Sequence, residues 1–294
     1  MRNTIAQEIF KYCKINKDGF LMAGDAGFGV WEKFREECPK QYINTGINEA
    51  AMTGMAAGLC FNQHKVFMYN IIPFVLMRNF EQIRVDLAYQ ECDTILIGIG
   101  SGITYAPAGM THYSVEDITI ALSLPNMQIF SPADPVEGVA CLRYAIQSNR
   151  LSYIRIAKSG EKKLHTNTVD ITHPIYLHKS SSQNILLLHG SIADEIDLIL
   201  EELDINVVSV PFINADIDWE MFLKPYKYIF TLEEHFIDGG FGSYLRDKVE
   251  RKVHKFGIPN HYIHTIGDRD YLRDYFEIDG ENIVRKIKDI LKGS

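Results

Sequence analysis

The chain has 294 residues, of which 46% are hydrophobic, so it can bury a sizeable core and we expect two domains. Its formal net charge of −8 and pI near 5.7 argue against a surface that binds nucleic acid. The cysteines are scattered without a Cys-x-x-Cys pair, so we expect reduced thiols. Neither a signal segment nor an apolar run of about 18 residues is seen, so we expect a soluble cytoplasmic protein with no membrane segment.

In the first half of the chain, short apolar runs that predict strands alternate with longer helical patterns. This alternation is typical of a mostly parallel sheet covered by helices. The predicted strands are 20–23, 65–70, 94–99, 127–130 and 152–156. The predicted helices are 49–59, 74–89 and one that starts near Pro135. Gly-rich turns follow the first and third of these strands, at 24–27 and 98–102.

The composition changes between residues 158 and 183, where Lys, His, Ser and Thr dominate and no periodic apolar pattern survives. We therefore expect a first domain at 1–160, a linker at 161–182 and a second domain at 183–294. In the second domain the predicted strands are 185–188, 206–210 and 228–232, and the predicted helices are 190–203, one after 239–243, and 280–291. The predicted fold class is α/β, with two doubly wound domains.

Glu49 is the most informative residue, because it is a single carboxylate in a stretch of small and apolar residues that runs from Tyr42 to Met55. A carboxylate beside an apolar pocket is costly unless a group there needs a hydrogen bond or a proton. The alternative is an ordinary acidic residue in the first turn of a helix, where the helix dipole favours negative charge.

Several further segments, taken in chain order, follow a known pattern. They are Asn44 to Leu59 around Glu49, Phe80-Glu81-Gln82-Ile83-Arg84 preceded by Phe74, Gly109-Met110-Thr111-His112, Glu116-Asp117-Ile118, Leu124-Pro125-Asn126-Met127, Pro132-Ala133-Asp134, Glu233-Glu234-His235 and Gly239-Gly240-Phe241-Gly242-Ser243. Together they resemble the pyrimidine-binding and carboxy-terminal domains of the transketolase family, including 1-deoxy-D-xylulose-5-phosphate synthases. The resemblance covers nearly the whole chain in the order of the family.

The resemblance implies thiamine diphosphate chemistry. Glu49 falls where the family places the acid that hydrogen-bonds the aminopyrimidine ring and so helps to remove a proton from the thiazolium. Phe74 matches an aromatic residue that packs against the pyrimidine, although it also fits a plain core residue. Ile71 stands where relatives often have a second aromatic residue, so apolar packing would remain without stacking. Asp25 matches an aspartate near the cofactor, and a turn-forming Asp is the alternative.

The same resemblance implies substrate contacts. His112 matches a histidine that faces the hydroxyls and carbonyl of the substrate and takes part in catalysis. Arg155 and Lys158 lie near a position where the synthases hold phosphate, and Lys158 equally suits a solvated surface lysine. Relatives usually have Asp at position 108, a basic residue at 131 and His at 100, whereas this chain has Ala, Ser and Gly there. These departures predict a modified or non-standard sugar substrate.

A complete thiamine diphosphate site also needs a domain with Gly-Asp-Gly and a later Asn that hold a divalent cation. This chain has no such pattern, and Gly24-Asp25-Ala26-Gly27 is the nearest string. We therefore expect no metal site here and a partner polypeptide, the amino-terminal transketolase subunit, that binds the diphosphate and Mg²⁺ or Ca²⁺. Two copies of each chain are expected to form a heterotetramer around a dyad.

The leading prediction is a subunit that helps to transfer a two-carbon ketol unit from a ketose or ketose phosphate to an aldose. The second is a subunit of a 2-oxo-acid decarboxylating enzyme, or a pyruvate-using synthase of the deoxyxylulose phosphate type. The third is a non-catalytic scaffold subunit, which the presence of both Glu49 and His112 disfavours.

Overall fold

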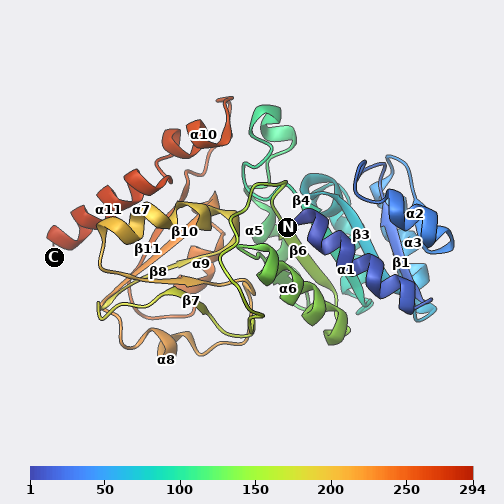
Figure 1. The fold of residues 1–294 in the computed structure, drawn as a ribbon, viewed down its shortest axis with the longest axis horizontal. Helices are drawn as coiled ribbons and strands as arrows, with labels where there is room; N and C mark the ends of the chain where they lie inside the picture. The colour runs from blue at the N-terminus through green and yellow to red at the C-terminus, as the bar shows by residue number, and fades with distance from the viewer. Residues whose placement is uncertain (294) are drawn as a thin grey trace.

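The computed structural model describes residues 1–293 and shows two α/β domains side by side (Figure 1). The first domain contains a six-stranded, all-parallel sheet in the order β2-β1-β3-β4-β6-β5. Its strands are β1 (Gly19–Ala23), β2 (Tyr42–Asn44), β3 (Lys65–Ile71), β4 (Thr94–Ile99), β5 (Gln128–Phe130) and β6 (Ser152–Ile156). Every residue of β4 and β6 is buried, as expected for a parallel sheet that is covered on both faces.

Two layers of helix cover this sheet. One face packs against α1 (Arg2–Ile15), α2 (Glu32–Glu37) and α6 (Pro135–Ser148). The other face packs against α3 (Glu49–Phe61), the helical turns that follow β3, and α5 (Asp117–Leu122). Side chains at successive positions of each strand point to opposite faces, so every strand supplies both apolar clusters.

The segment 74–89, predicted as one helix, is instead a broken helix. It consists of two π-helical turns, η2 (Pro73–Met77) and η3 (Ile83–Ala88), on either side of the short α4 (Phe80–Gln82). The N–H of Arg78 donates to the carbonyl of Pro73 at 3.0 Å, five residues earlier. The buried side chain of Asn79 shares a 2.7 Å hydrogen bond with Thr53 of α3 at this irregular point. Single π turns are frequent at functional sites.

The second domain has a five-stranded sheet in the order β11-β10-β8-β9-β7, and only β7 is antiparallel to its neighbour. Its strands are β7 (Ile175–His178), β8 (Asn184–Leu188), β9 (Asn206–Ser209), β10 (Tyr228–Phe236) and β11 (Val253–Ile258). Its helices are η5 (Gly190–Glu195), α7 (Ile196–Glu202), α8 (Trp219–Leu223), α9 (Phe241–Arg246), α10 (Arg269–Tyr275) and α11 (Gly280–Lys292). Strand β7 lies inside the predicted linker, so that segment contributes a sheet edge as well as a connection.

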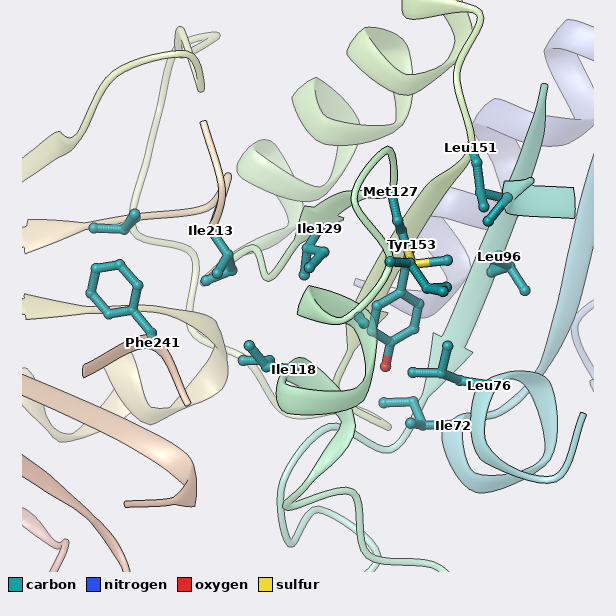
Figure 2. Packing of buried hydrophobic residues seen from close by; sticks show 14 of the residues in the cluster. Ile72, Leu76, Leu96, Ile118, Met127, Ile129, Leu151, Tyr153, Ile213 and Phe241 are labelled. Carbon is teal, nitrogen blue, oxygen red and sulfur yellow. The ribbon is translucent and has the colours of Figure 1, made fainter. Parts of the chain in front are cut away.

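The two domains share one apolar cluster, which continues from Ile118 and Ile129 of the first domain to Ile213 and Phe241 of the second (Figure 2). Backbone hydrogen bonds also cross the boundary, including Ile213 N–H to the carbonyl of Ile129 at 2.9 Å. Within residues 1–293, no helix is long and apolar enough to cross a membrane.

Candidate functional site

Three loops that follow parallel strands of the first sheet bring the candidate residues together. Phe74 follows β3, the loop that contains Tyr105 and His112 follows β4, and Lys158 follows β6. These strands are neighbours in the sheet, and the carboxyl ends of parallel strands meet at one edge, where α/β proteins usually bind ligands. The site is therefore built at the edge that the topology favours.

Glu49 begins α3 and is buried, with only 3% of its surface exposed. The preceding Asn48 caps the helix, because its side-chain oxygen accepts from the N–H of Ala51 at 3.2 Å. The carboxylate accepts a hydrogen bond of 3.1 Å from Nη1 of Arg78, and this is its ion pair in the structure. Glu49 is thus a buried acid in the first turn of α3, beside the other candidate residues.

Phe74 lies beside this acid, and Arg78 joins the two. The Arg78 guanidinium lies over the Phe74 ring, 4.3 Å from its centroid, while it donates to Glu49. The sequence analysis did not identify Arg78 as part of the site; the nearby Glu81 pairs with Arg84 at 3.6 Å. The sequence could have indicated the contact between Arg78 and Phe74, because residues four positions apart share one face of a helix.

His112 completes the cluster from the other side. Its ring contacts the ring of Phe74 edge-on at 5.9 Å between centroids, and it lies 5.7 Å from the ring of Tyr105. Lys158 in turn places its Nζ 5.1 Å from the centroid of Tyr105. Residues of three separate loops, with Glu49 of α3, therefore form one continuous set of contacts.

Tyr105 is a member of this cluster that the sequence analysis did not identify. Burial raises the pKa of its hydroxyl, and the positive charge of Arg2 opposes that effect. A Cβ at Gly100 would collide with the Tyr105 ring, and Gly100 has a φ of +97° that L side chains rarely adopt. Gly100 replaces the histidine of relatives, and the ring of Tyr105 occupies the place that a side chain at position 100 would take.

Arg155, which was expected to contact substrate, lies outside this set of contacts and is hydrogen-bonded within the protein. Its side chain is only 2% exposed, and its Nε donates to Asp117 at 2.7 Å. Its other nitrogens donate to Ser131 Oγ and the carbonyl of Ser114, each at 3.2 Å. All three guanidinium nitrogens of Arg155 donate to groups of the first domain.

The other two predicted cofactor contacts lie at the same edge of the sheet but outside the set of contacts described above. Ile71 is the half-buried last residue of β3. Asp25 is exposed in the turn after β1, has a φ of +51°, and its N–H donates to Asn44 Oδ1 at 3.1 Å. Neither shares a hydrogen bond or ring contact with Glu49 or His112 in the described part of the chain.

Two further observations bound the site. No group of three His, Cys, Asp or Glu side chains among residues 1–293 is arranged to hold a metal ion. A hollow of about 570 Å³ between α6 and residues 163–171 contains none of the clustered residues. The candidate site is made up of an acid, aromatic rings, a histidine and two cations.

Comparison with known proteins gives a consistent result. Residues 1–161 match the family described as the transketolase pyrimidine-binding domain. The chain is 30% identical over 264 residues to one subunit of the apulose-4-phosphate transketolase of Actinobacillus succinogenes, with 85% of each chain covered. The subunit of the same name from Phocaeicola vulgatus is 25% identical in an alignment of 306 positions that covers 99% of this chain and 97% of that one.

Longer proteins are also similar. The 1-deoxy-D-xylulose-5-phosphate synthase of Listeria monocytogenes is 29% identical in an alignment of 283 positions, which covers 90% of this chain but only 46% of the synthase. Among solved structures, a split-gene transketolase described as an inactive beta4 tetramer superimposes with a TM-score of 0.85 at 22% identity, covering 99% of this chain and 97% of that one. Transketolase from Campylobacter jejuni superimposes with a TM-score of 0.82 at 20% identity over 98% of this chain and 46% of that one. These structural likenesses establish the fold.

Proposed function

Because this chain belongs to the transketolase family, we propose that it is one subunit of a two-part, thiamine-diphosphate-dependent enzyme that transfers a two-carbon ketol unit from a ketose to an aldose. The chain covers 85% and 97% of the two apulose-4-phosphate transketolase subunits. It covers only 46% of the similar synthase. This difference in coverage favours a split enzyme over a single-chain one.

The arrangement of Glu49, Phe74 and Arg78 carries the cofactor part of this proposal. A planar guanidinium with N–H donors stacks on the ring of Phe74 and donates to the buried Glu49 carboxylate. An aminopyrimidine is also planar and also presents N–H groups, so the same two residues fit it. When bound, thiamine diphosphate would supply a nucleophilic carbon to carry the two-carbon unit.

Each clustered residue then has a chemical task. Glu49 would share a proton with the pyrimidine ring, and an apolar setting favours such sharing. Phe74 would lie against the ring face, and Ile71 and Asp25 at the same edge remain proposed cofactor contacts. His112 would hold or move a proton at a substrate oxygen, and Lys158, whose ammonium lies over Tyr105, would face an anionic group such as a sugar phosphate.

A partner polypeptide would complete the site. The chain has a net charge of −8, which disfavours binding of a diphosphate without added positive charge. We therefore propose that the diphosphate is held, through Mg²⁺ or Ca²⁺, by the amino-terminal transketolase subunit. Two copies of each chain would form the active assembly.

Decarboxylation of a 2-oxo acid is the second candidate, because the relatives include the deoxyxylulose phosphate synthase. Product analysis of the reconstituted pair, with thiamine diphosphate and Mg²⁺, separates the two reactions. Ketol transfer from ketose donors without carbon dioxide release supports the proposal, and carbon dioxide release from pyruvate supports the synthase. A comparison of phosphorylated with unphosphorylated ketoses tests the anion contact proposed for Lys158.

Substitution of Glu49 by Gln tests the catalytic role directly. The amide cannot share the proton, so we expect kcat of the assembled enzyme to fall by about 10²- to 10⁴-fold. Hydrogen–deuterium exchange at the reactive carbon of the bound cofactor should slow in parallel. Glu81→Gln is the control, because Glu81 is exposed and its partners are the surface residues Arg84 and Gln82. Full activity of Glu49→Gln would instead support a scaffold subunit.

A further inference from the structure

The loop that contains His112 belongs to the first domain in sequence but packs with the second. Residues 102–115 leave β4 and are closed by paired backbone hydrogen bonds between Gly102 and Ser114, at 3.2 and 2.9 Å. The buried apolar residues of this loop are Ile103, Ala106, Tyr113 and Val115, and they lie in the apolar cluster of the second domain. The position of His112 therefore depends on the second domain.

Glu234 of β10 holds the first end of this loop. Its Oε2 accepts from the N–H of Ile103 at 3.3 Å, and its Oε1 accepts from Nε of Arg269 at 2.9 Å and Nε of Arg273 at 2.6 Å. The carboxylate is only 4% exposed. A Cβ added at Gly102, whose φ is +60°, would collide with Glu234. The loop backbone therefore lies directly against this carboxylate.

The charge of Glu234 is well compensated. Burial alone would raise the pKa of Glu234, but the nearby guanidinium groups outweigh burial and lower it to about 2. Arg273 is itself held by Glu195 at 2.6 Å and by the carbonyl of Ser191 at 3.1 Å. The acid is therefore ionised at neutral pH and fixed in place by residues of η5 and α10.

Strand β10 also holds the second end of the loop. The N–H of Phe236 donates to the carbonyl of Val115 at 2.7 Å. Helix α10, which contains both arginines, contacts the turn at 106–111 next to His112, and Figure 1 shows the helix beside this loop. One strand and one helix of the second domain thus hold the loop on both sides of its exposed tip.

We propose that Glu234 is a positioning residue, which fixes the loop 102–115 so that His112, packed beside Tyr105, faces Phe74 at the site. This inference rests on the proposed function and assigns the carboxy-terminal domain a role in it. A displacement of reacting groups by about 1 Å can cost about 10²-fold in rate. Small movements of the loop anchor are therefore expected to affect substrate turnover more than cofactor binding.

The test compares Glu234→Gln with Glu233→Gln in the assembled complex. Glu233 is the adjacent buried acid on β10, but it accepts from the N–H groups of Phe241 and Gly242, at 2.8 and 2.9 Å, and not from the loop. In Glu234→Gln, an amide replaces one carboxylate oxygen, so the side chain cannot accept from the loop and both arginines as it does now. We expect about a 10²-fold fall in kcat/KM for the substrates, with unchanged Kd for thiamine diphosphate, in this variant only.

Hydrogen–deuterium exchange of peptides from 102–115 gives a readout independent of activity. We expect faster exchange in Glu234→Gln and wild-type exchange in Glu233→Gln. Normal exchange and normal kcat/KM in Glu234→Gln would overturn the inference, as would equal losses of kcat/KM in both variants. If Glu234→Gln does not fold, Arg269→Gln takes its place, because Arg269 is more accessible and supplies one of the two cations.

The two proposals fail in distinguishable ways. An inactive wild-type assembly would contradict the proposed function, whereas the exchange comparison would still test whether Glu234 holds the loop. An active assembly with indifferent Glu234 variants would contradict the positioning role alone.

Discussion

Arg78 occupies the position that we propose for the cofactor ring. Its guanidinium meets both requirements of the pair Glu49 and Phe74, a hydrogen bond to the acid and a flat face against the ring. Its side chain is 49% exposed, so movement into solvent costs it little burial. In the assembled enzyme the cofactor ring would have to displace it from Phe74.

Replacement of Arg78 by Ala should therefore tighten cofactor binding. An ion pair with one exposed partner contributes up to about 1 kcal/mol, which is about a fivefold change in an equilibrium constant. We expect the Kd for thiamine diphosphate in the assembled complex to fall by up to about that factor, measured by calorimetry. Arg84→Ala is the control, since Arg84 pairs with the exposed Glu81. A weaker Kd in Arg78→Ala would mean that Arg78 supports the bound cofactor and does not compete with it.

At the scale of elements, a helix or strand could be predicted where neighbouring residues determine it, and not where contacts between distant residues do. Strands β4 and β6 match their predicted bounds, because each is a short apolar run closed by turn residues. The π turns around α4 could not be predicted, since they depend on Asn79 meeting Thr53 of another helix. Strand β7 was missed for a similar reason: its residues are only half-buried or exposed, and its pairing with β9 is not local.

The site follows the same rule. Glu49 and His112 were found through sequence motifs, whereas Tyr105 was missed because its role depends on the space left by Gly100. The contacts of Arg155 could not be predicted, because its pairing with Asp117 joins β6 to α5 and no local pattern reveals such a contact. Sequence thus suggested which residue types make up the candidate site, while the partners of each side chain required the fold.

The segment between the domains is attached to α6 by a hydrogen bond that depends on pH. His165 Nε2 lies 2.9 Å from Oε1 of Glu137, and the N–H groups of Leu164 and His165 donate to Asp134 at the helix amino terminus, each at 2.9 Å. The hydrogen bond to Glu137 raises the pKa of His165, and burial opposes that effect only in part. Protonated His165 is therefore favoured in the folded chain.

The raised pKa of His165 determines how the stability of the chain changes with pH. A raised folded-state pKa contributes stability that is fully present below about pH 6.5, the ordinary value for His, and is lost as pH rises through the folded-state pKa. We expect the Tm of the wild-type chain to fall relative to His165→Gln as pH rises from about 6 to about 8.5, measured by scanning calorimetry. Parallel Tm profiles for the two proteins would show that this pair does not contribute.

At the scale of the whole molecule, α3 presents a surface that suits close approach of another chain. Ile47, Met55 and Phe61 are 77%, 45% and 62% exposed around this helix. Gly54 and Gly58 lie on its open side, where an added Cβ would meet no atom within 4 Å. Because Glu49 starts the same helix, a protein that docks here would also cover the site.

Substitution of Gly54 by Arg should prevent assembly with another chain without impairing folding. The position is open in the isolated chain, and replacement of a helical Gly stabilises the helix by up to about 1 kcal/mol. We therefore expect an unchanged or higher Tm for the isolated chain, together with loss of the complex in light scattering after size exclusion. Gln147→Arg, at an exposed position of α6, is the control. Normal assembly of Gly54→Arg would place the subunit interface elsewhere.

Strand β7 comes from the segment that connects the two domains, and this affects any attempt to divide the protein. Cleavage or truncation at residue 183 would leave β9 with one bare side, and its unsatisfied amides and carbonyls would be a template for intermolecular strand addition. A stand-alone second half should therefore start before Ile175, so that the fragment keeps its own border strand. We therefore infer that the second half begins before Ile175 and not at residue 183.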